Sequence, residues 1–307
     1  MLNLFLDSGA WSHFTGRANI NLDMYSKFLT RYKNEVKIFA NLDVVHNGEA
    51  SYQNWLELKK QGHNTMPVFH ADIDLKYLKR YLENSNTIAL GALVGVNKIQ
   101  RLSNLDYLWK HFLTNSQGYP THKVHGFALT DIDIMVRYPW YSVDSSTWIK
   151  HAAYGMILVP KKGLETKPNF LGPAMAVSLS DVSGRMYGEE GSNSFSNFSK
   201  HEQKLIRNYV KNTLHLEWGR SEFLEVENDY KLLKNERFIT DKELKGASNV
   251  NMQTLFPVHF SPQHNKKMIE RIIEPGVSNY VNLRIRANIR YYKLVMQAMP
   301  YPKKFEV

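Results

Sequence analysis

The stretch LDSGAW, from Leu6 to Trp11, places an aspartate directly after an apolar, β-rich run. Two further stretches share this form, NLDVV at Asn41–Val45 and WYSVDSSTW at Trp140–Trp148. In a parallel barrel, side chains at the carboxyl ends of the strands face one shared pocket. The pattern therefore predicts that three carboxylates, far apart in the sequence, meet around one ligand. They belong to Asp7, Asp43 and Asp144.

The first half of the chain alternates between apolar, β-favouring runs and polar, helix-like runs. The expected strands are residues 2–6, 36–44, 66–70, 87–91 and 124–129. The expected helices between them are residues 22–33, 52–61, 75–83 and 105–113. Such alternation is typical of βαβ units and a parallel sheet. Because no G-x-G-x-x-G turn follows the first strand, an α/β, TIM-like (β/α)8 barrel is favoured over an open dinucleotide-binding sheet.

After Asp144 the alternation becomes irregular. The expected elements there are strands at 154–160 and 174–180, a loop rich in glycine and serine at 183–199, and a helix over 200–215. We therefore expect a barrel with an irregular second half over residues 1–250. Residues 251–307 are expected to form a basic C-terminal segment that packs on this barrel.

Composition narrows the class of protein. The 307 residues carry a formal net charge of +10 and include no cysteine. Basic domains often bind a polyanion, because lysine and arginine release the counterions condensed on phosphates. The absence of cysteine excludes disulfides and thiolate metal sites. No run approaches the roughly 20 apolar residues of a membrane span, and no leader is visible before the first expected strand. We expect a cytoplasmic protein that binds nucleic acid and no membrane; a merely basic surface is the alternative.

Several motifs resemble the tRNA-guanine transglycosylase superfamily, whose members are TIM barrels. DSGAWS at Asp7–Ser12 resembles the family's DSGGFQ, and LGALVGV at Leu90–Val96 resembles its IGGLAVG. NLDVV and SVDSSTW hold aspartates where the family keeps its purine-reading aspartate and its nucleophile. The motifs also follow one another in the family's order.

A smaller branch is more similar still, the phage and bacterial relatives that insert 7-deazaguanines into DNA. Its pattern DSGA-[FW]-S, NLDV, PVFH, HGF and YPWYSVDSSSW is nearly repeated, with PVFH at 67–70, HGF at 125–127 and YPWYSVDSSTW at 138–148. The match covers about residues 1–150. The tRNA enzymes hold a structural zinc with cysteines and carry VLPTR beside the nucleophile. This chain has no cysteine and has SSTW there, so DNA is the expected substrate. If the chain is encoded by a phage, the expected compartment is the cytoplasm of the host.

The resemblance implies a base exchange on an unbroken strand, for which a covalent glycosyl-enzyme is the natural device. Asp144 would attack the sugar C1′, and Asp7 would protonate the departing guanine and deprotonate the incoming 7-deazaguanine. Asp43 would accept hydrogen bonds from the N1–H and 2-amino groups of the base. No cofactor is expected. Further substrate-binding residues are expected at the same strand ends, namely Ser8, Gly9, His70, Gly91, Ala92, His125 and Gly126.

The last fifty residues interleave lysine and arginine with tyrosine, a composition that suits a phosphate backbone with stacked bases or sugars. From this segment we expect Arg284, Arg286 and Arg290 to contact nucleic acid. A helix face in solvent is the alternative.

Other interpretations stay open at this point. In isolation, Asp7 or Asp144 could simply cap a helix. Base exchange on tRNA is the nearest alternative function. A metal-dependent barrel hydrolase could use His70, His125 and Asp7, but no H-x-H or H-E-x-x-H spacing supports it and we expect no metal. A non-catalytic nucleic-acid-binding protein on a decayed barrel is a third alternative. The deazapurine inserted, the DNA context and the oligomeric state are not predicted.

Overall fold

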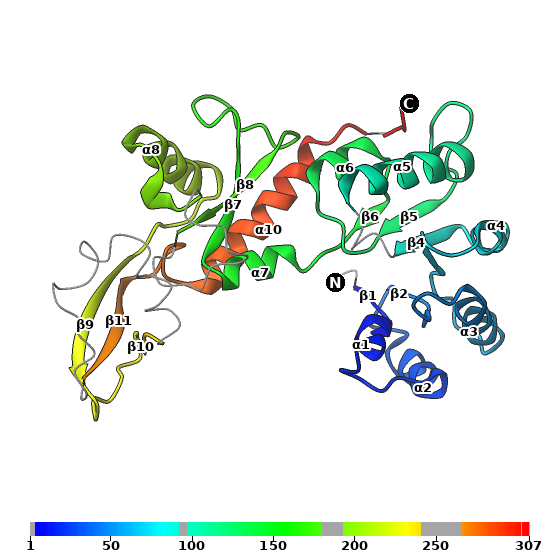
Figure 1. Cartoon of the computed structure of the whole chain (residues 1–307), viewed down its shortest axis with the longest axis horizontal. Coiled ribbons are helices and arrows are strands. Elements are labelled where there is room, and N and C mark those ends of the chain that lie inside the picture. The colour runs from blue at the N-terminus through cyan, green and yellow to red at the C-terminus, as the bar shows by residue number, and fades with distance from the viewer. Residues whose placement is uncertain (1–3, 92–96, 180–192, 241–265, 302, 307) are drawn as a thin grey trace. The chain divides into compact units, whose positions relative to one another are not determined.

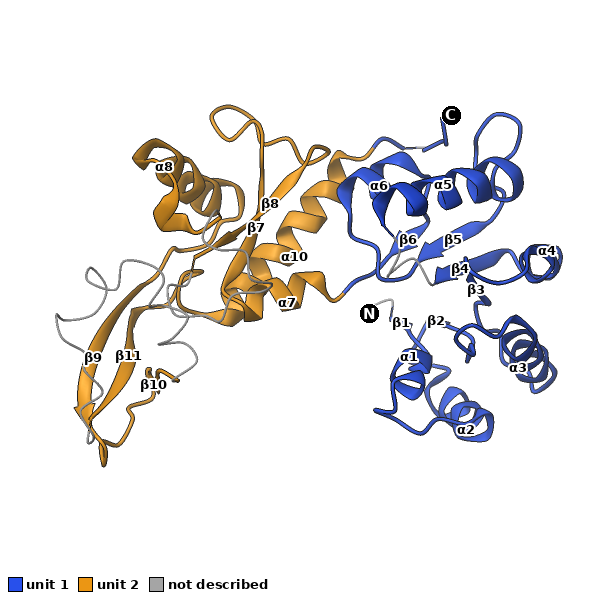
Figure 2. Cartoon of the chain, viewed as in Figure 1, with its two compact units in different colours: residues 1–145, 300–307 blue, residues 146–299 orange. Residues whose placement is uncertain are grey.

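The computed structural model describes residues 4–91, 97–179, 193–240, 266–301 and 303–306, which form a mixed α/β structure (Figure 1). The chain divides into two compact units (Figure 2). The first contains residues 1–145 and 300–307, and the second contains residues 146–299. The boundary expected at residue 250 lies outside the described residues.

The first unit contains six short parallel strands within the described ranges. They are β1 (Phe5–Leu6), β2 (Ile38–Phe39), β3 (Val68–His70), β4 (Thr87–Gly91), β5 (Lys123–Gly126) and β6 (Ser142–Val143). β1 pairs with β2, and β3 to β6 form a four-stranded sheet in chain order. A parallel bridge between Ala40 and Met66 joins the end of β2 to the start of β3. The predicted parallel sheet is confirmed, although its first two strands are shorter than expected.

Helices separate these strands, as the sequence pattern predicted. They are α1 (Ala10–Phe14), α2 (Leu22–Tyr32), α3 (Gly48–Lys60), α4 (Leu75–Asn84), α5 (Lys98–Leu108) with the π-helical turn η1 (Trp109–Leu113), and α6 (Ile132–Arg137). Most begin at a side chain that accepts a hydrogen bond from the first turn, which satisfies a free backbone N–H. These caps are Asn21, Asn47, Asp74, Asn97 and Asp131.

The strands of the first unit curve around a shared interior. Buried Ala40, Met66, Val68 and Ala89 form one cluster, and the partly buried side chains packed on it are Phe5, Ile38 and Phe127. The Phe5 ring lies 4.4 Å from the His125 ring, centroid to centroid. Because β1 and β5 are not hydrogen-bonded neighbours, this contact requires a curved array. The eight-stranded barrel itself stays a prediction.

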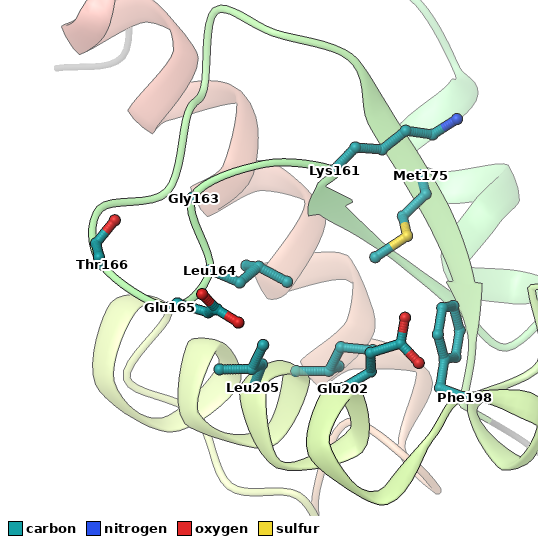
Figure 3. A pocket seen from close by; sticks show the side chains of 10 residues that line it. Lys161, Gly163, Leu164, Glu165, Thr166, Met175, Phe198, Glu202 and Leu205 are labelled. Carbon is teal, nitrogen blue, oxygen red and sulfur yellow. The ribbon is translucent and has the colours of Figure 1, made fainter.

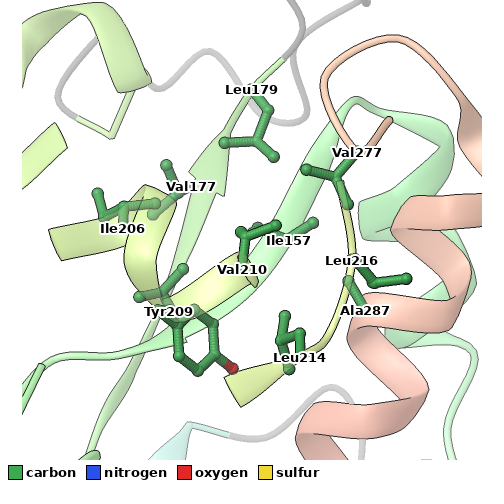
Figure 4. Close-up of a cluster of buried hydrophobic side chains, with 11 residues drawn as sticks. Ile157, Val177, Leu179, Ile206, Tyr209, Val210, Leu214, Leu216, Val277 and Ala287 are labelled. Atoms are coloured by element: carbon green, nitrogen blue, oxygen red, sulfur yellow. The ribbon is translucent and has the colours of Figure 1, made fainter. Parts of the chain in front are cut away.

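The second unit breaks the repeating pattern. It contains α7 (Thr147–Ala153), β7 (Met156–Pro160), β8 (Ala174–Ser178), η2 (Phe195–Asn197), α8 (Lys200–Asn208), η3 (Tyr209–Thr213), β9 (Arg220–Glu227), β10 (Glu236–Phe238), β11 (Lys266–Glu274) and α10 (Val281–Ala298). β7 pairs with β8, and β11 lies between β10 and β9; all these pairs are antiparallel. Strand β7, α8, η3 and α10 contribute to a shared core that includes Ile157, Ile206, Val210 and Ala287 (Figure 4). The strands expected at 154–160 and 174–180 are present as β7 and β8, and the helix expected over 200–215 is present as α8 and η3, which end at Thr213. Most of the loop expected at 183–199 lies outside the described residues.

The last described residues return to the first unit. The backbone N–H of Phe305 donates to the carbonyl of Gly118 at 2.8 Å, and its ring stacks on Tyr138. Gly118 has φ +84°, and a Cβ there would lie 2.3 Å from the Phe305 carbonyl oxygen, so only glycine fits this contact. No helix within the described ranges is both long and apolar enough to cross a membrane.

Candidate functional site

The three aspartates expected to meet do lie within one electrostatic neighbourhood. Asp7 follows β1, Asp43 follows the β2 segment and Asp144 follows β6. Asp7 is exposed at its surface, but neighbouring protein atoms crowd the carboxyl, and this desolvation is the largest cause that raises its pKa. The negative charges of Asp43 and Asp144 raise the pKa further, and the backbone N–H groups of Ser8 and Gly9 lower it. Like charges disfavour ionisation in this way only when they are close together. The structure therefore brings all three carboxylates to the same end of the parallel strands.

The DSG turn joins two of these carboxylates. The backbone N–H of Ser8 donates to Asp7 Oδ1 at 2.7 Å, and the Ser8 hydroxyl donates to Asp43 Oδ1 at 3.3 Å. Gly9 caps α1 with φ +79°, a left-handed conformation that glycine adopts without steric cost. A Cβ on Gly9 would also lie 2.8 Å from Ile20 Cδ1. The predicted site residues Ser8 and Gly9 thus shape the turn that positions Asp7 beside Asp43.

Asp43 forms a buried pair with His70. The Nε2 atom of His70 lies 2.9 Å from Asp43 Oδ2, and the two side chains are only 7% and 9% exposed. The His70 ring packs over Gly91, where a Cβ would lie 2.9 Å from His70 Cδ2. Gly91 was expected to let a base approach the backbone; in this structure the histidine ring occupies the space that the missing side chain leaves. Ala92 lies outside the described residues.

Asp144 is held differently. Its side chain is 48% exposed, and its Oδ1 accepts a hydrogen bond from the Ala128 backbone N–H at 2.9 Å. Its own backbone donates to Gly126 and accepts from Leu129. Ala128 has φ +54°, an uncommon conformation for a residue other than glycine and one that recurs at functional sites. That conformation aims the Ala128 N–H at the carboxylate.

His125 and Gly126, also predicted site residues, lie on β5, which pairs with the strand that precedes Asp144. His125 is 2% exposed, and its Nδ1 is 2.8 Å from the Ser142 hydroxyl oxygen on the adjacent strand. A Cβ on Gly126 would lie 3.0 Å from the Trp140 ring, so the glycine makes room for an aromatic side chain of the core. Sequence reasoning missed Ser142 and Ala128. Its place two positions before the strand-end aspartate could have identified Ser142 as a site residue, but no sequence signal marks the backbone conformation of Ala128.

The prediction that Arg284 contacts nucleic acid is wrong. Arg284 is 5% exposed, and its guanidinium donates to the carbonyls of Ala152, Val277 and Ser278. Burial lowers its pKa to about 10. A guanidinium can satisfy several backbone carbonyls at once, so an arginine within an apolar helix face can stay inside. This side chain joins segments of the second unit and is closed to phosphate.

The other two arginines differ from each other. Arg290 is partly buried, and it donates to the carbonyls of Leu214 and His215. Arg286 is exposed, so its contact with nucleic acid stays a prediction. Both belong to the second unit, whereas the three aspartates belong to the first.

The second unit has a pocket of its own, about 440 Å³ in volume, between α8 and the segment that joins β7 to β8 (Figure 3). Its lining includes Leu164, Met175, Phe198, Glu165 and Glu202. None of the residues predicted from the sequence to form a site lines it. Glu202 has its pKa lowered by hydrogen bonds from Ser199, as a helix-capping carboxylate does. The carboxyl whose pKa is raised, Asp7, lies instead in the first unit.

Across the described ranges, no group of three or more histidine, aspartate or glutamate side chains is arranged to hold a metal ion. Comparison of the chain with family models, with curated proteins and with solved structures found no match. The carboxylates and histidines of the first unit are therefore the residues that bear on function.

Proposed function

We propose that this chain is a DNA-guanine transglycosylase that exchanges guanine for a 7-deazaguanine through a covalent glycosyl-aspartate. One observation carries the proposal: Asp7, Asp43 and Asp144 converge from the ends of parallel strands, and the two others raise the pKa of Asp7. Carboxylates held in different environments are what a displacement with retained configuration at an anomeric carbon requires.

The different environments suggest different roles. Asp7, whose pKa is raised, keeps its proton to a higher pH and suits a general acid. Asp144 is half exposed, with one oxygen bonded to a backbone N–H, and suits a nucleophile. Asp43 is bonded to Ser8 and His70 and suits a fixed acceptor for the guanine edge.

The proposed reaction has two displacements. Asp144 attacks the sugar C1′ while the bond from C1′ to the base breaks, and a nitrogen of the departing guanine takes the proton of Asp7. The incoming 7-deazaguanine then gives a proton to Asp7, and its nitrogen attacks C1′. The bond from C1′ to Asp144 breaks, so the carboxylate is restored and the strand is never cut.

We also infer that the six parallel strands belong to a TIM-like barrel. Strand order along the sheet follows chain order, and the rings of Phe5 and His125 bring β1 to β5 across the interior. In such barrels the carboxyl ends of the strands carry the catalytic side chains. The three aspartates lie at those ends.

The preference for DNA over tRNA rests on the sequence: the resemblance to the DNA-modifying branch, the missing cysteines and SSTW in place of VLPTR. Of the basic C-terminal residues, Arg284 is buried and Arg286 is exposed, so only Arg286 of these two stays a candidate for nucleic-acid contact. The metal-dependent hydrolase loses support, because His70 is already bonded to Asp43 and no described group of three ligands includes either histidine.

The decisive experiment is nucleoside mass spectrometry of DNA and tRNA from cells that express the chain together with a 7-deazaguanine supply. We expect a deazaguanine nucleoside in DNA, and none when Asp144→Asn replaces the wild type. Modification of tRNA alone would overturn the DNA substrate. Modification of neither polymer, in vivo or with purified protein and free base, would overturn base exchange.

A further inference from the structure

His125 is a buried side chain whose hydrogen bonding is left incomplete. It lies on β5, it is 2% exposed, and the Phe5 ring covers it at 4.4 Å. Its Nδ1 is 2.8 Å from the Ser142 hydroxyl oxygen. Its Nε2 has no hydrogen-bond partner within the part of the chain that the structure describes. A buried polar atom without a partner costs about 1–3 kcal/mol, so its retention here points to a role.

The unpartnered nitrogen faces the proposed nucleophile. His125 Nε2 is 3.7 Å from Asp144 Oδ1, close enough for electrostatic attraction and too long for a hydrogen bond. Hydrogen bonds of a catalytic site are often long without substrate and tighten in the complex. A shift of less than about 1 Å would bring this pair into hydrogen-bond range.

The neighbours of the ring determine which nitrogen carries the proton. The Ser142 hydroxyl can donate to Nδ1, which leaves the proton on Nε2. The opposite tautomer would set the lone pair of Nε2 against the oxygen of Asp144, a repulsive arrangement. Electrostatics therefore favours the Nε2–H tautomer, with its proton directed at Oδ1.

We propose that His125 is a positioning residue that orients Asp144 for attack, an inference that rests on the proposed function. Two donors face Oδ1, the Ala128 N–H and the His125 Nε2–H. Among the described residues we find no partner for Oδ2, which is therefore the oxygen that attacks. In this proposal His125 acts through Asp144.

In the reaction, Oδ2 forms its bond to C1′ as the bond from C1′ to the base breaks. The electron pair of that bond leaves with the base, which takes its proton from Asp7. Oδ1 then becomes the carbonyl oxygen of the glycosyl ester and still accepts from both donors. When the incoming base displaces Asp144, the same donors stabilise the carboxylate that returns. His125 keeps its proton throughout.

The tautomer can be measured without any reaction. Nitrogen-15 NMR of the full chain, labelled at histidine, should show a protonated Nε2 and an unprotonated Nδ1 for His125. Its Nε2 signal should shift in Asp144→Asn and stay in place in Asp23→Asn, a control at an exposed acid that pairs with Lys27 on its own helix. An Nδ1–H tautomer, or an Nε2 signal that ignores Asp144→Asn, overturns the proposal.

The kinetic test compares two amides. Gln at 125 can place an N–H near the position of Nε2, whereas Asn can reach only the position of Nδ1. In single turnovers, His125→Asn should slow formation of the trapped protein–DNA adduct by about 10- to 100-fold, the usual effect of losing a group that orients a ligand. His125→Gln should recover most of the rate, and KM for DNA should stay within about twofold in both variants.

A matched control is His122→Gln. His122 directly precedes the first residue of β5, and its ring contacts the Leu82 carbonyl. This variant should leave adduct formation unchanged. Equal losses in the Asn and Gln variants, with unchanged thermal midpoints, would show a packing role alone and overturn the proposal. If the wild-type chain exchanges no base, the proposed function fails; the tautomer and its response to Asp144→Asn then decide whether His125 orients this carboxylate.

Discussion

Two carboxylate–histidine pairs stand at one end of the same parallel strands, and they are built in opposite ways. Asp43 and His70 are buried, with a 2.9 Å contact between Oδ2 and Nε2. Asp144 is 48% exposed and stands 3.7 Å from a histidine that is itself buried. The buried Asp43–His70 pair holds its carboxylate in one orientation, which suits a residue that only binds the base. The more exposed Asp144–His125 pair leaves one carboxylate oxygen free to form a bond.

The largest expected difference between the pairs is in the chemistry. Asp144→Asn removes the attacking oxygen's charge, and it should slow base exchange by at least about 10³-fold, as losses of a nucleophile do. Binding of DNA, measured by fluorescence anisotropy, should change little. Near-normal exchange in this variant would show that Asp144 is not the nucleophile. The two carboxylates would then no longer differ in the roles proposed for them.

Stability should show the reverse order. Asp43→Ala leaves His70 buried without its partner, and such a break costs about 3 kcal/mol. Asp144→Ala loses one hydrogen bond at a hydrated site and should cost about 1 kcal/mol. Urea denaturation of the two variants measures both changes in the free energy of unfolding. Equal changes in the free energy of unfolding would contradict the tighter packing of the Asp43–His70 pair.

The two acids should also act unequally on Asp7. The charge of Asp43 raises the pKa of Asp7 more than the charge of Asp144 does. Asp43→Asn should therefore lower the pKa of Asp7 by more than Asp144→Asn, as followed by carbon-13 NMR of the Asp7 carboxyl. The acid form would then be lost at a lower pH, so exchange by Asp43→Asn should fall off earlier as pH rises. A larger shift in Asp144→Asn would contradict this order of the two charges.

The smallest effect concerns Asp7 itself. Its pKa is raised in the folded chain, so the folded state holds this proton more tightly than the unfolded state does. The charged carboxylate therefore lowers stability above the raised pKa, and this penalty disappears as pH falls below the unfolded value. Asp7→Asn should raise the thermal midpoint slightly at neutral pH, by less than about 1 kcal/mol in free energy, and not at all at pH 3. Calorimetry at both values tests this, and a loss of stability at neutral pH would contradict it.

Much of the first unit could be predicted, because its signals are local. Apolar runs that end in a polar residue or glycine marked β3, β4 and β5, and the polar runs between them became helices, although α3 and α5 begin earlier than expected, after the caps Asn47 and Asn97. The same pattern placed Asp7, Asp43 and Asp144 at strand ends. Parallel strands bring such ends together whatever the intervening sequence, so distance along the chain was no obstacle.

Other features depend on partners that a single sequence does not specify. A segment of arginines and tyrosines has the same composition whether its helix face is exposed to solvent or buried. Arg284 is buried because its guanidinium donates to the carbonyls of Ala152, Val277 and Ser278. Gly91 and Gly126 were expected at a ligand, yet the rings of His70 and Trp140 fill the space beside them. Which side chain takes that space depends on packing across strands.

The sequence by itself therefore determined the alternation of strands and helices and the placing of three aspartates at strand ends, since both follow from the polarity pattern within a few residues. Only the tertiary structure decided how those aspartates differ. The curved sheet buries Asp43 against His70, leaves Asp144 half in solvent and turns Ala128 to hold one of its oxygens. Burial and hydrogen-bond partners distinguish identical side chains, and both are set by segments distant in sequence.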